Sequence, residues 1–105
     1  MYRVGYNLHV IEIQETAVFS RWFEGLRDKA AQFRIAVRIR RLELGNFGDV
    51  KSVGEGISEL RITYGPGYRV YLTRRGDTLV ILLAGGDKSS QARDVERAKK
   101  LAREL

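Results

Sequence analysis

The chain has 105 residues, 44% hydrophobic and 30% charged, a balance that indicates one folded domain over residues 1–105 rather than a disordered chain. The absence of cysteine excludes disulfides, thiolate metal sites and cysteine nucleophiles, and it fits a reducing cytoplasm. The net charge of +6 favours a polyanionic partner, either nucleic acid or an acidic protein.

The N-terminal residues lack the basic start and apolar run of a signal peptide. No stretch approaches ~18 uninterrupted apolar residues, the length that spans a membrane. We therefore expect a cytoplasmic protein that does not contact membranes. No cofactor or metal ion is expected.

The first predicted strand covers residues 8–13 and follows an arm of residues 1–7. This strand holds His9, the single histidine of the chain, which we interpret as a structural residue. A single histidine excludes the paired acid and base of a two-histidine ribonuclease.

Two helices are predicted next, packed together as a helical hairpin. Thr16 is the expected N-cap of the first helix. Its apolar residues recur at the spacing of one buried face, namely Phe19, Trp22, Phe23 and Leu26. The second helix, over residues 28–44, carries a basic ridge formed by Arg34, Arg38 and Arg41. Residues 21–41 hold seven basic residues against two acidic ones, so the ridge is a candidate nucleic-acid surface, with a merely solvated surface as the alternative.

Residues 45–56 contain four glycines and are predicted to form a loop. Lys51 is the single cation of this loop and is close in sequence to the hairpin that follows. It is a candidate phosphate contact, and a solvated lysine is the alternative.

The hairpin pairs strands 57–64 and 68–74 around the turn Gly65-Pro66-Gly67. Strand side chains alternate faces, so the even positions predict a core face. The odd positions predict a polar face that displays Glu59, Arg61, Arg69 and Tyr71. A three-residue turn would place Tyr64 opposite Tyr68 and Arg61 opposite Tyr71, with Arg69 as a diagonal neighbour roughly 7–8 Å away.

A third strand, residues 78–84, is apolar at consecutive positions and is expected to be central and covered on both faces. It leads through Gly85-Gly86-Asp87-Lys88 into a last helix over residues 89–104. Because helix starts favour anions, residues 85–91 are a second candidate phosphate site, with Lys88 and Gln91 as its polar side chains.

These elements give the order β-α-α-β-β-β-α, an α+β fold with an antiparallel sheet against the N-terminal helical hairpin. Three blocks of sequence carry a resemblance: Gly56-Ile57-Ser58-Glu59-Leu60-Arg61, Gly67-Tyr68-Arg69-Val70 and Gly85-Gly86-Asp87-Lys88. In this order they resemble the RelE/ParE toxin superfamily, and most closely its HigB-like, phage Gp49-like "addiction module killer" branch.

The resemblance implies the toxin of a bacterial type II toxin–antitoxin pair and a small RelE-like fold. Many such toxins are mRNA interferases, metal-independent endoribonucleases that inhibit translation by cleaving mRNA on the ribosome. By position, Arg61, Arg69 and Lys88 match the family's catalytic cations. The chain departs from the RelE pattern in having Glu59 where a basic residue is frequent, and in lacking a tyrosine after Lys88.

Guanidinium groups suit the charge that gathers on a phosphate attacked by its own 2′-hydroxyl. We assign this role to Arg61 and Arg69, with Lys88 beside the leaving oxygen or a flanking phosphate. Glu59 is the candidate general base, with orientation of a neighbouring cation as its alternative role. Tyr71 is a candidate for stacking on a base or donating a proton. The remaining RNA-binding candidates are Lys51, Gln91, Arg34, Arg38 and Arg41.

Two other functions remain open at this point. One is a ParE-like poison of DNA gyrase, and the other is a non-enzymatic nucleic-acid binder that uses the basic ridge. The expected partners are mRNA on the ribosome and a cognate acidic antitoxin laid across the cationic face of the hairpin.

Overall fold

The computed structural model describes residues 10–105, so the predicted arm and His9 lie outside the described residues. The elements, in chain order, are β1 (Glu12–Glu15), α1 (Ala17–Glu24), α2 (Lys29–Glu43), β2 (Val50–Gly54), β3 (Ile57–Ile62), β4 (Tyr68–Arg75), β5 (Leu79–Asp87), the short 3-10 turn η2 (Lys88–Ser90) and α3 (Gln91–Arg103).

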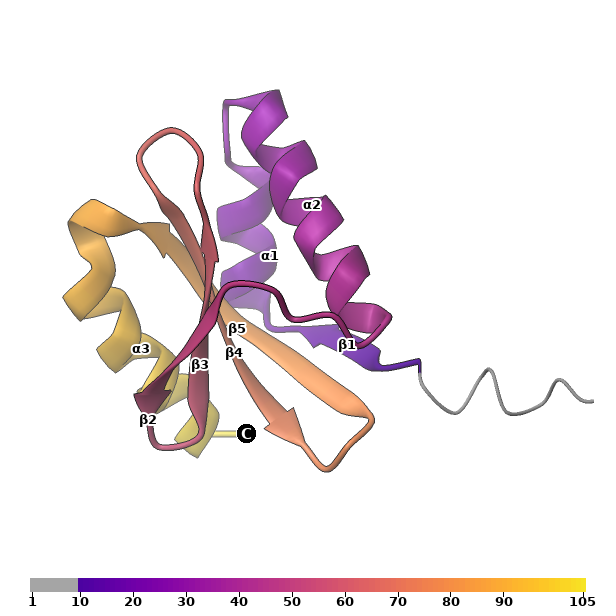
Figure 1. Ribbon diagram of the computed structural model, residues 1–105. Helices are drawn as coiled ribbons and strands as arrows, with labels where there is room; N and C mark the ends of the chain where they lie inside the picture. The colour runs from indigo at the N-terminus through magenta and orange to yellow at the C-terminus, as the bar shows by residue number, and fades with distance from the viewer. Residues whose placement is uncertain (1–9) are drawn as a thin grey trace, which may run out of the picture.

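The strands form one five-stranded sheet in the order β1-β5-β4-β3-β2. Helices α1 and α2 lie on one face of the sheet and α3 lies on the other (Figure 1). The predicted α+β architecture with an N-terminal helical pair is confirmed. The prediction of a wholly antiparallel sheet is wrong at one edge, because β1 runs parallel to β5. The long connection between these two strands permits the same direction, which a tight hairpin does not.

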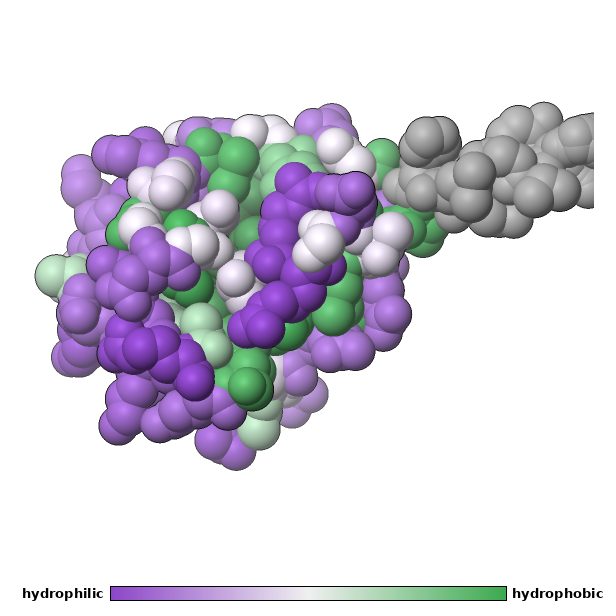
Figure 2. All heavy atoms as spheres, turned by 90° about the horizontal axis from the view of Figure 1, so that it is seen from below, coloured by the Kyte–Doolittle hydropathy of each residue, from purple (hydrophilic) through white to green (hydrophobic). Residues whose placement is uncertain are grey.

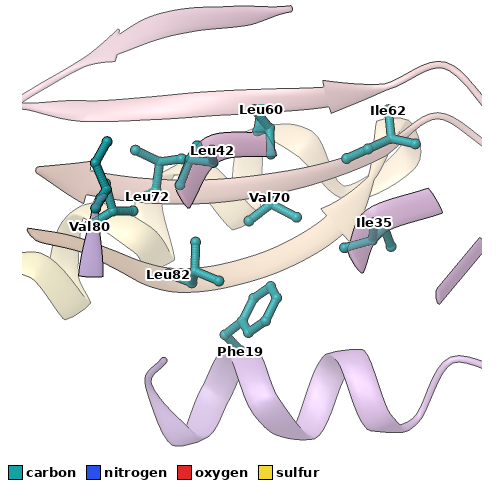
Figure 3. Packing of buried hydrophobic residues seen from close by; sticks show 10 residues of the cluster. Phe19, Ile35, Leu42, Leu60, Ile62, Val70, Leu72, Val80 and Leu82 are labelled. Carbon is teal, nitrogen blue, oxygen red and sulfur yellow. The ribbon is translucent and has the colours of Figure 1, made fainter. Parts of the chain in front are cut away.

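The larger core lies between the sheet and the first two helices. Phe19 of α1 and Ile35 and Leu42 of α2 point toward the sheet, as Figure 3 shows. Their partners are apolar residues of three strands, namely Leu60, Ile62, Val70, Leu72, Val80 and Leu82. The predicted core face of the hairpin and the predicted apolar face of the first helix are therefore confirmed.

Side-chain caps begin both N-terminal helices. The hydroxyl of Thr16 accepts a hydrogen bond from the Phe19 amide at 3.0 Å and donates one to the Leu83 carbonyl at 2.6 Å. The carboxylate of Asp28 accepts from the amides of Ala30 and Ala31. Since Thr16 also bonds to β5, its cap fixes the start of α1 against the sheet.

The other face of the sheet is covered by α3, and this corrects the prediction of an open polar face on the hairpin. Ile57, Tyr71, Ile81 and Leu83 pack there against Ala98 of α3. Glu59 is buried on the same face. The apolar stripe of α3 needs a partner, and the mixed odd face of the hairpin supplies it.

The predicted loop of residues 45–56 contains a strand, β2, which pairs antiparallel with β3. Its exposed sequence, Val50–Gly54, has little of the alternation that marks a strand, so pairing with β3 decides its conformation. Lys51 lies opposite Glu59 in this ladder and its side chain is exposed.

The register of the β3–β4 hairpin differs from the predicted one. Ile62 pairs with Tyr68 and Arg61 pairs with Arg69, while Glu59 pairs with Tyr71. The connection is a five-residue loop, 63–67, in which Gly65 and Gly67 adopt positive φ values of 57° and 80°. Two such glycines permit a wider loop than the predicted three-residue turn, and this shifts the pairing by two residues.

The surface seen from below in Figure 2 is largely hydrophilic, with hydrophobic residues visible between the hydrophilic ones. Within residues 10–105, no helix is both long and apolar enough to cross a membrane.

Candidate nucleic-acid cleft

A cleft of about 290 Å³ lies where loop 63–67 meets the turn after β5. Three cations from three elements line it: Arg61 of β3, Arg69 of β4 and Lys88 of η2. The other lining residues are Asp49, Ile62, Thr63, Tyr64, Gly65, Gly67 and Tyr68. The three residues predicted to act on the phosphate therefore share one cavity.

The backbone explains why segments distant in sequence meet here. Arg61 and Arg69 are directly cross-strand, so their side chains leave the same face of the ladder. The amide of Lys88 lies 3.4 Å from the carbonyl of Pro66, which ties η2 to the tip of the hairpin loop. Arg69 Nη1 also donates to the Gly67 carbonyl at 2.7 Å and so holds the loop from within the cleft.

Glu59 lies beneath the two arginines with no exposed surface. Its Oε1 accepts a hydrogen bond from Arg61 Nε at 3.1 Å, and its Oε2 lies 3.6 Å from Arg69 Nε. Tyr71 Oη and Gln91 Nε2 donate to Oε2 at 3.0 and 2.8 Å. Arg69 Nε is buried and makes no hydrogen bond. Its contact with Glu59 is therefore an ion pair that lacks a hydrogen bond.

The pKa of Glu59 reflects two opposing effects. Burial disfavours the charged form and raises the pKa, whereas the hydrogen bonds from Gln91, Arg61 and Tyr71 lower it. The hydrogen bonds and the nearby Arg69 outweigh burial, so the pKa of Glu59 lies below its usual value. Burial and the bond to Glu59 raise the pKa of Tyr71. Glu59 is thus an ionised acceptor and Tyr71 a neutral donor at neutral pH.

The other predicted RNA-binding residues lie outside the cleft lining. Tyr71 is buried, and Gln91, the first residue of α3, contacts Glu59. The basic ridge borders a separate groove of about 490 Å³ beside α2, where Arg34 and Arg41 are exposed. This groove and the cleft share Ile62 and Thr63, so the two hollows adjoin on the surface.

Arg38, the middle residue of the ridge, binds the protein's own backbone. Its guanidinium donates to the carbonyls of Arg61, Phe47 and Asp49. Partial burial lowers its pKa. Arg38 therefore joins α2 to β3 and to the segment before β2.

Comparison with known proteins identifies the family. Residues 21–105 match the sequence model of the family described as "Phage derived protein Gp49-like (DUF891)". The chain belongs to this family. It is also 54% identical over 95 residues to an uncharacterized protein of Haemophilus influenzae, an alignment that covers 90% of this chain and 96% of that protein. All the residues that line the cleft fall inside the part of the chain that matches the Gp49-like family.

Sequence reasoning missed three side chains of the cleft in this Gp49-like chain: Asp49, Tyr64 and Tyr68. Tyr64 Oη donates to Asp28 at 2.9 Å, and the guanidinium of Arg34 stacks over its ring at 4.5 Å. Alternation assigned both tyrosines to the core face, and both do pack against the core cluster, but at the loop end of the hairpin they also line the cleft. The repeated glycines around the turn were the signal for a wider, accessible loop.

Gly85 and Gly86 have a packing role that the prediction of a phosphate-binding segment did not foresee. Both lie within β5, and neither has a positive φ. A Cβ on Gly85 would lie 2.5 Å from Trp22 Cδ2, and one on Gly86 would lie 2.8 Å from Asp94 Cγ. The two glycines therefore let α1 and α3 approach opposite faces of the same strand.

Proposed function

We propose that this Gp49-like protein is the toxin of a type II toxin–antitoxin pair and cleaves mRNA on the ribosome, in the manner of RelE- and HigB-like toxins. The observation that carries the proposal is the convergence of Arg61, Arg69 and Lys88 on one cleft. Membership of a phage-derived family and the resemblance of the three sequence blocks to addiction-module toxins support it.

The chemistry follows from the charges in the cleft. The RNA 2′-hydroxyl loses its proton to water and its oxygen bonds to the adjacent phosphorus. The bond from phosphorus to the 5′-oxygen breaks, and this oxygen takes up a proton from solvent, so the products carry a 2′,3′-cyclic phosphate and a 5′-hydroxyl. The two guanidinium groups stabilise the charge on the phosphoryl oxygens. Lys88 is exposed at the rim and would contact the leaving oxygen or a flanking phosphate. Preorganised donors of this kind contribute about 2.7–4 kcal/mol each to catalysis.

The ring of Tyr64 replaces buried Tyr71 as the candidate for stacking on a base. It lines the cleft, and its contacts with Asp28 and Arg34 restrict its orientation. An aromatic face beside a cationic groove is the usual arrangement for holding a single-stranded nucleotide.

The proposed protein partner is an acidic antitoxin segment that covers the same cleft. Three cations in a small cavity attract carboxylates as readily as phosphates, so one acidic segment would neutralise the site and exclude RNA. Co-purification of the product of the neighbouring gene tests this. Binding that is insensitive to both Arg61→Ala and Arg69→Ala would place the antitoxin elsewhere.

The function is tested by induced expression followed by mapping of mRNA 5′ ends, with and without a block on translation. Arg69→Ala should reduce cleavage by about 10²–10³-fold and relieve growth arrest. Arg75→Ala is the matched control, because Arg75 is an exposed arginine at the far end of the same strand. Equal mRNA cleavage by the wild type and by Arg69→Ala would refute the proposed ribonuclease activity of this cleft. Double-strand DNA breaks with intact mRNA would instead indicate gyrase as the target.

A further inference from the structure

A buried acidic residue under two cleft arginines requires an explanation, since burial of a carboxylate is costly unless it is paired. Glu59 is fully buried, and each of its oxygens faces a different arginine. The side chains of Tyr71 and Gln91 supply the remaining donors. Every polar partner of this carboxylate thus either donates a hydrogen bond to it or carries a positive charge.

We propose that Glu59 is a positioning residue that fixes the orientation of Arg61 and Arg69 toward the cleft, and that Tyr71 and Gln91 hold it in place. The inference rests on the proposed function insofar as those arginines act on an RNA phosphate. It assigns Tyr71 and Gln91 to the support of the site rather than to contact with RNA.

The geometry favours positioning over general-base catalysis. A base must come within about 2.6–3.2 Å of the proton that it removes, directly or through one water. Glu59 has no exposed atom through which a 2′-hydroxyl could approach, and both of its oxygens already accept hydrogen bonds from the protein. Glu59 faces the Nε atoms of both arginines, and the terminal nitrogens of Arg61 make no hydrogen bond to it.

The contact with Gln91 depends on the close approach of α3 to β5. Gln91 is the first residue of α3, and Gly86 allows Asp94 of the same helix to lie directly over the strand. The hydroxyl of Ser90 donates a hydrogen bond to the Asp94 carboxylate across the first turn of the helix. Two neighbouring contacts, Gln91 with Glu59 and Asp94 over Gly86, therefore hold the start of α3 close to the sheet.

The test compares Glu59→Gln with Glu55→Gln. Glu55 is the matched control because it also pairs with two cations, Lys99 and Arg103, but is half exposed and lies outside the cleft lining. ¹H–¹⁵N correlation NMR spectra that resolve the arginine Nε–Hε groups report on the orientation of Arg61 and Arg69 without any RNA. Cleavage of mRNA in a translating extract supplies kcat and KM, and thermal unfolding verifies the fold. Tyr71→Phe serves as a milder variant, because it removes a single donor and keeps the ring.

In Glu59→Gln we expect the Nε–Hε signals of both arginines to shift and broaden. Because a misplacement of about 1 Å can cost 10²-fold, kcat should fall by about that factor, with little change in KM. Tyr71→Phe should give a smaller change of the same kind, and Glu55→Gln should give none. The pH profile of kcat should keep its shape in Glu59→Gln, whereas loss of its acidic limb would make Glu59 the base and overturn the inference.

The two proposals fail in different ways. Unchanged arginine signals in both Glu59→Gln and Tyr71→Phe would overturn the positioning role, whatever the activity. Shifted signals in a protein whose wild type leaves mRNA intact would support the positioning role and refute the ribonuclease.

Discussion

Replacing Gly86 by alanine tests the close contact between α3 and the sheet. A Cβ at this position would lie 2.8 Å from Asp94 Cγ and closer still to Oδ2. Carbon atoms pack best at about 3.5–4.0 Å, so the Asp94 side chain must withdraw by about 1 Å or more. Overpacking of this kind costs about 1–3 kcal/mol. The contact lies beside Gln91, so the same displacement should weaken the hydrogen bond to Glu59.

The assay is chemical unfolding followed by the fluorescence of Trp22, the single tryptophan of the chain. The free energy of unfolding of Gly86→Ala should fall by about 1–3 kcal/mol with no change in denaturant dependence. Asp94→Ala alone loses the hydrogen bond from Ser90 and should cost about 1 kcal/mol. In the double variant the overlap with the Asp94 carboxylate is absent, so the combined loss should be smaller than the sum of the single losses.

The coupling free energy between Gly86→Ala and Asp94→Ala tests whether this contact causes the destabilisation. If the free-energy losses of Gly86→Ala and Asp94→Ala add within about 0.5 kcal/mol, the contact between them is not the source of the destabilisation. Gly85→Ala provides a comparison on the other face, because its Cβ would overlap the ring of Trp22 rather than α3. It should destabilise the fold without an additional effect on the Glu59 contacts.

Three further predictions concern the supports of the cleft. Arg38→Ala should lower the free energy of unfolding by about 1.5–3 kcal/mol, since its guanidinium bonds to three carbonyls, whereas exposed Arg34→Ala should stay within about 1 kcal/mol in the same chemical unfolding assay. Thr16→Ala should cost about 1–2 kcal/mol in thermal unfolding, because α1 loses its cap and its bond to β5. The folded pKa of Glu59 is lowered, so its contribution to stability is present above the unfolded value of about 4.3 and disappears as the pH falls through the folded pKa. Acid titrations should therefore show a smaller loss of stability in Glu59→Gln than in the wild type, and equal losses would contradict this assignment.

The sequence allowed the main elements and the candidate cations to be predicted, because both depend on local signals. Apolar spacing identified the helix around Phe19 and the core strands, since burial repeats with the period of each element. The arginines and Lys88 were recognised from short motifs that keep their order along the chain. The same reasoning failed for β2, whose strand conformation depends on its pairing with β3.

The partners of Glu59 show the limit of local reasoning. Alternation placed Glu59 and Tyr71 on the same face of the hairpin, and this was right. It could not reveal that α3 covers that face, because the helix begins at Gln91, 32 residues after Glu59 in the chain. The carboxylate of Glu59, predicted to face solvent, is instead buried and has four donor or cationic partners.

The sequence by itself determined which residues could form helices and strands and which cations were available, because periodicity and charge are properties of the chain. The tertiary structure alone decided that Arg61 faces Arg69 across a wide loop, that Lys88 meets them in one cleft, and that Glu59 is sealed beneath them. These relations depend on hairpin register and on the packing of α3, which are set by the balance of contacts over the whole fold and not by any one segment.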